Sequence, residues 1–192
     1  MILLKFWNNK LLGIFGAIYQ FIPAIYLMFI DKLSSKLQCM NITCIGKHIQ
    51  IQAKGIIRFP KNITLSERVH IGRAVELSTE VETSYLKIEE YSQISKNCYL
   101  DYTGNLTIGK NCTLSEEVMI QTHSHGLSPK NKPIPLSLQI DDNVWIGAKA
   151  CILHNVNRIG ENSIIAACAV VTKDVPKNVI VAGNPAQIIR NI

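Results

Sequence analysis

The chain of 192 residues has few charged and few aromatic side chains, which make up 18% and 7% of its residues. It also lacks any run of five or more basic residues, although its net charge is +6. Proteins that bind nucleic acid usually gather lysine and arginine in such a run or stripe. We therefore expect no nucleic acid partner, and we assign the positive charge to an anionic ligand or an anionic membrane surface.

Cysteines with CxxC spacing are also absent from the sequence. That spacing is typical of many zinc and redox sites, so its absence argues against both. The cysteines instead fall largely inside the repeats described below, and we expect buried, unpaired thiols in a reducing cytoplasm. They are Cys39, Cys44, Cys98, Cys112, Cys151 and Cys168.

Charge is missing altogether from residues 11–30, LLGIFGAIYQFIPAIYLMFI. Such a stretch is long enough for a helix to cross roughly 30 Å of hydrocarbon. Lysines on both sides leave its orientation undecided, no small-residue cleavage site of a signal peptide follows, and Pro23 would kink a helix. Three interpretations stay open: a helix on or re-entering the membrane, a full span, and a helix packed on the domain or a neighbouring subunit. We expect residues 1–40 to form a hydrophobic, membrane-associating segment and residues 41–192 the main domain.

The most informative pattern is an aliphatic residue at every sixth position. Between residues 140 and 175, with one inserted residue, these positions hold Ile140, Ile146, Ile152, Ile159, Ile165 and Val171. A helix would repeat every 3.6 residues and a half-buried strand every 2. A step of six fits a short strand followed by a tight corner, and three such sides make one triangular coil of about 18 residues.

The same step runs through most of the chain from about Cys44, with interruptions near residues 59–60, 82–86, 102–105 and 126–139. It predicts about six or seven coils whose aliphatic side chains form one column, each contributing roughly 1.5–3 kcal/mol on burial. The longest interruption contains three prolines that forbid regular strand pairing, so we expect a projecting loop there. The expected fold is all-β: a parallel β-helix with an N-terminal hydrophobic helix and that loop.

Two histidines, His123 and His125, stand at the entrance to the predicted loop. A histidine pair at this place fits acid–base chemistry, and it fits solvated surface residues equally well. The other histidines, His48, His70 and His154, are scattered along the chain. Because no carboxylate or third histidine has the spacing of metal ligands, we expect no metal.

Three short motifs follow one another in the C-terminal half: NVWIG at residues 143–147, VTKDVP at 171–176 and AGNPA at 182–186. Together with the repeats, they resemble the hexapeptide-repeat O-acetyltransferases over about residues 45–192. That family includes maltose and galactoside acetyltransferases and the acetyltransferases of capsule, lipopolysaccharide and exopolysaccharide synthesis. The resemblance implies a left-handed β-helix, a homotrimer with its active site between two subunits, and acetyl-CoA as co-substrate.

The resemblance also assigns a general base. In the family, a histidine just before the loop takes the proton from the acceptor hydroxyl, which attacks the thioester of acetyl-CoA. Counting without gaps places the family's T-x-x-H motif on Thr122 and His125. His125 is therefore the first choice as the base, and His123 is the runner-up because a shift of two residues is easy at a loop entrance.

Residues for the acceptor sugar follow from the same resemblance, since the family uses an acid and an amide one coil earlier. Asp101 matches the acid, although a turn carboxylate is an equal interpretation. Gln93 and Asn97 are the candidates for the amide. Trp145, on the face beside the loop, is a candidate for contact with the cofactor, although packing is the more common role of such a residue.

Coenzyme A is expected to lie along the coil stack near a subunit boundary, where its pantetheine amides can pair with exposed backbone. By resemblance, the small residues Ala148, Ala167 and Thr172 line this track. Lys173 and Arg190 are expected near the phosphates, where fixed positive charge and charge-assisted hydrogen bonds matter.

We therefore expect an acetyl-CoA-dependent O-acetyltransferase that acts on a carbohydrate hydroxyl in capsule, lipopolysaccharide or exopolysaccharide synthesis. Acetyl-CoA is made in the cytosol, so we expect a cytoplasmic protein, and the hydrophobic segment points to the inner face of the cytoplasmic membrane and a lipid-linked acceptor. Transfer to an amino sugar or amino acid stays open, because it would use the same fold, base and donor. So do a β-helix scaffold without turnover and, more remotely, a metal-dependent hydratase.

Overall fold

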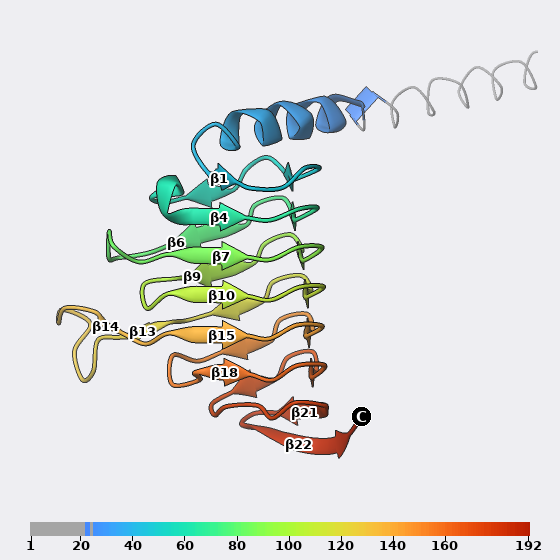
Figure 1. The fold of residues 1–192 in the computed structure, drawn as a ribbon. Coiled ribbons are helices and arrows are strands. Elements are labelled where there is room, and N and C mark those ends of the chain that lie inside the picture. Colours follow the sequence, from blue (N-terminus) through green and yellow to red (C-terminus); the bar gives the residue numbers. More distant parts are fainter. Residues whose placement is uncertain (1–21, 24) are drawn as a thin grey trace, which may run out of the picture.

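Stacked triangular coils form the body of the molecule (Figure 1), in a computed structural model that describes residues 22–23 and 25–192. Each coil contributes one short strand to each of three parallel sheets that run along the stack. There are about seven turns, with a single helix at the N-terminal end of the described residues. The prediction of an all-β parallel β-helix with six or seven coils is confirmed.

The three sheets are named here in the order in which the chain enters them. The first sheet contains β1 (Thr43–Cys44), β4 (Ile63–Leu65), β7 (Leu86–Ile88), β10 (Leu106–Ile108), β15 (Leu138–Ile140) and β18 (Arg158–Ile159). The second contains β2 (Gln50–Ile51), β5 (His70–Ile71), β8 (Gln93–Ile94), β11 (Thr113–Leu114), β16 (Trp145–Ile146), β19 (Ile164–Ile165), β21 (Val179–Gly183) and β22 (Ala186–Asn191). The third contains β3 (Ile56–Ile57), β6 (Glu76–Ser78), β9 (Tyr99–Asp101), β12 (Met119–Ile120), β17 (Cys151–Ile152) and β20 (Val170–Val171).

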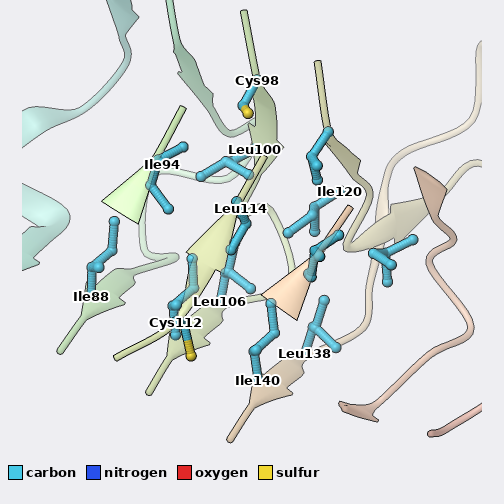
Figure 2. Packing of buried hydrophobic residues seen from close by; sticks show 14 of the residues in the cluster. Ile88, Ile94, Cys98, Leu100, Leu106, Cys112, Leu114, Ile120, Leu138 and Ile140 are labelled. Atoms are coloured by element: carbon cyan, nitrogen blue, oxygen red, sulfur yellow. The ribbon is translucent and has the colours of Figure 1, made fainter. Parts of the chain in front are cut away.

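The aliphatic residues at the repeat positions fill the interior of the coils. In one coil Ile108, Leu114 and Ile120 come from the three sheets, and all three are fully buried. Leu114 is in register with Ile94 in the coil before and with Ile146 in the coil after, so equivalent side chains stack in a column (Figure 2). Each side of each coil thus buries one apolar side chain along the axis of the stack, and these side chains together form the hydrophobic core.

The cysteines agree with the sequence prediction in part. All six are unpaired. Cys98 and Cys112 lie in the core, where burial raises the pKa of each thiol to about 11. Cys168 is exposed, which departs from the expected burial, because it stands at a corner of its coil rather than on an inward-facing position.

Two of the three corners are regular. The step between core positions is six residues both from the first sheet to the second (Ile108 to Leu114) and from the second to the third (Leu114 to Ile120). Each of these corners turns on a residue with positive φ, such as Asn111 (53°) and Glu117 (61°). Asparagine tolerates this left-handed conformation better than most residues, which explains the asparagine-containing corners of the sequence.

The third corner, from the third sheet back to the first, is variable in length. The step is eight residues from Leu100 to Ile108, 11 from Leu77 to Ile88 and 20 from Ile120 to Ile140. The interruptions noted in the sequence all fall here, so they stack above one another along a single edge of the prism. We call this edge the variable corner.

The projecting loop is confirmed, with different bounds. It was predicted for residues 126–139, but the chain leaves the coil at β13 (His123–Ser124) and returns through β14 (Ile134–Pro135) before β15 begins at Leu138. The two strands are antiparallel, with His123 opposite Pro135, so the prediction that the prolines exclude strand pairing is wrong for Pro135. A two-strand hairpin consists only of edge strands, where proline is tolerated. Figure 1 shows this segment projecting from the stack.

A helix over residues 25–38 lies across the N-terminal end of the stack (Figure 1), and a 3-10 turn, η1 (Pro60–Asn62), precedes β4. The Ser35 hydroxyl accepts from the Ile51 N–H at 2.7 Å, and Asp31 accepts from the Ala53 N–H at 3.0 Å and forms an ion pair with Arg73. The helix therefore satisfies backbone groups at the exposed edge of the first coil, which a terminal coil requires.

The predicted hydrophobic segment is described only in part. Of the predicted segment over residues 1–40, residues 1–21 and residue 24 lie outside the described residues. Among the described residues, no helix combines the length and the apolar character needed to cross a membrane.

Candidate active site

Three successive coils bring polar side chains together on the variable corner. Asp101 ends β9, and because Leu100 pairs with Ile120, the residues after Ile120 stack on those after Leu100. Ser78 pairs with Asp101, so the coil before adds Glu80 to the same edge. His123 follows in the coil after Asp101 and opens the projecting segment. Register between coils, rather than proximity in sequence, assembles this site.

A buried carboxylate holds His123. Asp101 is 1% exposed, and its Oδ2 accepts from the His123 Nδ1–H at 2.8 Å. The same oxygen accepts from the backbone N–H of Thr122 at 2.6 Å, while Oδ1 accepts from the Thr103 hydroxyl at 2.5 Å and from its N–H at 3.1 Å. Thr122 and Thr103 are themselves fully buried, so the carboxylate is fixed in one orientation.

The ionised form of Asp101 is favoured despite its burial. Burial alone raises the pKa of this carboxyl, but hydrogen bonds from the Thr103 hydroxyl, the Thr122 N–H and His123 more than offset that effect. The pKa therefore lies below its ordinary value. An ionised carboxylate can only accept hydrogen bonds, so the proton of a neutral His123 stands on Nδ1 and the lone pair on Nε2.

His125 is held by the projecting segment. Its Nδ1–H donates to the backbone carbonyl of Asn131 at 2.7 Å, and the Asn131 side chain returns a hydrogen bond to the His125 carbonyl at 3.0 Å. The two imidazoles meet edge to face, with ring centroids 4.9 Å apart and 3.2 Å between the Nε2 of His123 and that of His125. The side chain of His125 is 26% exposed, compared with 14% for His123.

Glu80 completes the cluster, and the sequence analysis did not identify it. Its Oε1 lies 3.6 Å from the Nε2 of His123 and 3.6 Å from the Nε2 of His125. Its N–H donates to the Thr103 hydroxyl at 3.0 Å, which ties it to the Asp101 network. Glu80 directly precedes the interruption at residues 82–86, and only the stacking of interruptions on one corner could have pointed to it.

Gly104 allows the projecting segment to pass close to the site. A Cβ on Gly104 would stand 2.2 Å from the carbonyl oxygen of Thr122 and 2.3 Å from the N of Leu136. These two backbone groups are hydrogen-bonded to each other at 2.8 Å, and the Gly104 N–H donates to the Thr122 hydroxyl at 2.9 Å. Only glycine fits this approach, because the obstacles are backbone atoms.

Of the three residues predicted to hold the acceptor, only Asp101 lies in the cluster. We expected its carboxylate to hold a sugar, but its oxygens are occupied by Thr103, Thr122 and His123. Gln93 lies in β8, on the second sheet, and lines a pocket with His70. Asn97 occupies the left-handed position of a regular corner. Within one chain, neither amide meets the histidines.

The residues predicted to contact CoA lie on both sides of the third sheet. Ala148 and Ala167 occupy equivalent places at a regular corner, because Ile146 pairs with Ile165. Trp145 stands nearby, is 51% exposed as a residue, and donates from Nε1 to the Ser115 hydroxyl at 3.0 Å. Small side chains leave the backbone of this corner accessible to a ligand.

Thr172 and Lys173 follow β20 on the variable corner, two coils beyond the coil of His123. Lys173 and Arg190 are both exposed. Arg190 lies in β22 at the C-terminal end of the stack, where it pairs with Ile180. The AGNPA motif makes the turn between β21 and β22, so it closes the β-helix.

The curated relatives that the sequence matches are named as acetyltransferases. No family model matches the sequence. The galactoside O-acetyltransferase of Escherichia coli is 36% identical over 106 residues, which are 53% of this chain and 51% of that protein. The chain spans about half the length of these curated relatives.

Solved structures share the fold over most of the chain. A hexapeptide-repeat acetyltransferase from Vibrio cholerae matches with a TM-score of 0.61 and 25% identity, over 84% of this chain and 80% of the other. A variant of AntD, an N-acyltransferase from Bacillus cereus, matches with a TM-score of 0.71 and 20% identity, over 82% and 88%. These matches confirm both the left-handed β-helix and the resemblance of this chain to hexapeptide-repeat acetyltransferases.

Proposed function

We propose that the chain is an acetyl-CoA-dependent O-acetyltransferase that acetylates a sugar hydroxyl, with His123 as the general base. The observation that supports this most directly is the buried Asp101 carboxylate on Nδ1 of His123. A base oriented by a third group in this way is the usual arrangement for activating a hydroxyl. The sequence count favoured His125, but Nδ1 of His125 donates to a backbone carbonyl rather than to a carboxylate, and its side chain is more exposed.

The proposed reaction needs one proton transfer in each direction. The Nε2 of His123 removes the proton from the acceptor hydroxyl while its oxygen attacks the thioester carbonyl. When the tetrahedral intermediate collapses, the bond to sulfur breaks and the thiolate of CoA takes the proton from the imidazolium. The acetyl ester and free CoA leave, and the histidine returns to its neutral form. Asp101 is a positioning residue that stabilises the imidazolium between the two transfers.

Support for the donor comes from similar proteins and from the corner residues. The AntD variant was crystallised with coenzyme A and dTDP-4-amino-4,6-dideoxyglucose. In this chain we place the pantetheine arm along Ala148, Ala167 and Thr172, and the phosphates near Lys173 and Arg190. The first four of these residues flank the third sheet, Arg190 lies on the second sheet, and the two cations are exposed.

The name of the Escherichia coli relative favours a hydroxyl acceptor over an amine. The test is an assay of the purified full chain with acetyl-CoA and matched acceptors, such as a galactoside and glucosamine, with thiol release and product mass as readouts. We expect ester formation on a hydroxyl sugar. N-acetylated product alone would establish the amine alternative, and no binding of acetyl-CoA in a thermal-shift titration would return the chain to the scaffold interpretation.

A homotrimer is part of the proposal, because the residues expected around CoA and acceptor do not all meet within one chain. Gln93 on the second sheet and His123 on the variable corner would approach each other only across a boundary between copies. Light scattering on the purified chain tests this, and a monomer with full activity would contradict it.

We also place the enzyme at the inner face of the cytoplasmic membrane, acting on a lipid-linked saccharide of capsule, lipopolysaccharide or exopolysaccharide synthesis. The helix over residues 25–38 holds the first coil through Asp31 and Ser35, and much of its apolar surface faces outward. The exposed residues are Ile22, Ile25, Tyr26, Met28, Phe29, Leu33 and Leu37. Lys32 and Lys36 lie on the same helix and suit an anionic surface.

Co-sedimentation with anionic phospholipid vesicles tests the membrane proposal. We expect the full chain to pellet with the vesicles and the double variant Met28→Glu/Phe29→Glu to stay in the supernatant. If the unaltered chain stays in the supernatant, the proposal is wrong.

A further inference from the structure

Glu80, His123 and His125 direct three electron-pair donors at one point. Each imidazole donates its Nδ1–H to a group that can only accept, the Asp101 carboxylate or the Asn131 carbonyl. In neutral imidazoles both Nε2 atoms therefore present lone pairs, and they face each other across 3.2 Å. The Glu80 carboxylate faces the same point from a third side. Three acceptors in one place repel one another unless a metal ion or a proton lies between them.

The separations fit a tetrahedral metal ion. Zn²⁺ binds histidine nitrogen and carboxylate oxygen at about 2.1 Å, and tetrahedral angles then hold two ligand atoms about 3.4 Å apart. Here the separations are 3.2 Å between the two Nε2 atoms and 3.6 Å from Glu80 Oε1 to each of them. Three protein ligands leave one position open, as in zinc sites that keep a bound water.

The surrounding hydrogen bonds also match a metal site. Metal-binding histidines nearly always donate their second N–H to a carboxylate or a backbone carbonyl, and here one histidine uses each kind. The third ligand is also oriented, because the Glu80 N–H donates to the Thr103 hydroxyl, which donates to Asp101. The connection after β6 and the projecting segment, which lie far apart in sequence, thus supply the three ligands.

We propose that Glu80, His123 and His125 bind a divalent transition metal ion, with Zn²⁺ the best fit to the donor set. The ion would occupy the Nε2 lone pair that the proposed base needs. Metal binding and acyl transfer are then mutually exclusive, so Zn²⁺ inhibits the enzyme; this second statement rests on the proposed function. Metal binding itself does not.

The test is a titration of the metal-free full chain with Co²⁺, followed by displacement with Zn²⁺. Tetrahedral Co²⁺ has visible absorption bands that report the geometry of the site. We expect one ion for each chain, about 100-fold weaker binding in His125→Ala and at least about tenfold weaker binding in Glu80→Gln. Glu82→Gln, an exposed carboxylate in the same connection, and His48→Asn, an exposed histidine at a regular corner, should bind as the unaltered chain does.

Thermal melting of each variant shows whether it is folded. If His125→Ala does not fold, Glu80→Gln still tests the site, because glutamine has nearly the same shape as glutamate. Saturable binding that both ligand variants weaken supports the site. No uptake, or uptake that neither variant changes, overturns it and leaves a shared proton between the imidazoles. Binding in a chain without acyl transfer would support the metal site and contradict the proposed function, whereas activity that Zn²⁺ leaves unchanged would contradict the inhibition.

Discussion

The regular corners and the variable corner of this β-helix follow different rules, although one chain builds both. At the regular corners, each core residue is followed six positions later by the next, and one residue between them takes the left-handed conformation. At the variable corner the step varies, from seven residues (Ile152 to Ile159) to 20 (Ile120 to Ile140) between strands. Insertions occur at the corner where they leave the stacking of the strands intact. The residues of the proposed active site lie at this same variable corner.

The comparison also separates two kinds of buried residue. The core positions are aliphatic and stack on equivalents in neighbouring coils, so they determine stability. The buried polar residues Asp101, Thr103 and Thr122 lie at the variable corner and bond to one another and to His123. Substitutions in the first group should lower stability without changing the chemistry, whereas substitutions in the second should change the chemistry as well, because these residues hold His123.

Removal of the proposed base should give the largest effect. We expect His123→Ala to lower kcat for acyl transfer by about 10²–10⁴-fold, because His123 is the imidazole of this cluster whose Nδ1–H is held by a buried carboxylate. The histidine at a regular corner gives the matched control: His48→Asn should retain the rate. Thiol release under saturating acetyl-CoA measures both. If His123→Ala keeps its rate while His125→Ala loses it, the base is His125, as the sequence count indicated.

The second prediction concerns how Asp101 acts. If it positions His123, Asp101→Asn should lower kcat about 100-fold and leave the KM of the acceptor nearly unchanged, because the neutral amide cannot stabilise the imidazolium. If it holds the sugar, as the resemblance implied, the acceptor KM should rise instead. Steady-state kinetics with varied acceptor distinguish the two roles. Asp142→Asn, whose carboxylate accepts from the Lys110 N–H at a regular corner, is the control and should change neither constant.

Sequence reasoning predicted the regular part of the molecule better than the variable part. A step of six fixed which residues face inward, and residues such as Leu114 and Ile146 are buried as expected. The interruptions could be located but not aligned, because each has its own length and no period. Glu80 was therefore not predicted as a site residue, although its Oε1 lies 3.6 Å from the Nε2 of both His123 and His125.

For Asp101, the sequence predicted the position of the residue but not its role. Its place one coil before the histidines was inferred from the resemblance, and the structure puts it in contact with His123. Which of its neighbours it contacts depends on a register between coils and on the exit angle of the projecting segment. Neither can be derived from residue types, because both depend on backbone atoms such as those around Gly104.

A core substitution should give the opposite result from His123→Ala. Leu114→Ala removes a fully buried side chain from the column, and we expect it to lower the free energy of unfolding by about 2–5 kcal/mol. The rate for each folded molecule should stay unchanged. Denaturant unfolding and thiol release measure the two quantities. Met119→Ala, on an outward-facing position of the neighbouring strand, should cost less than about 0.5 kcal/mol. Equal losses at both positions would contradict a core that lies on the axis.

The smallest predicted effect tests whether the regular corners are shaped by stacking or by residue preference. Ala74 has φ of 56° and no side-chain polar group that could favour the left-handed conformation. We expect Ala74→Gly to raise the free energy of unfolding by about 1 kcal/mol, because glycine reaches positive φ without steric cost. Asn111→Gly, at φ of 53°, should gain less, since asparagine already tolerates this region. If both variants are destabilised instead, the loss of backbone entropy outweighs the strain, and the corners are held by their hydrogen bonds to neighbouring coils alone.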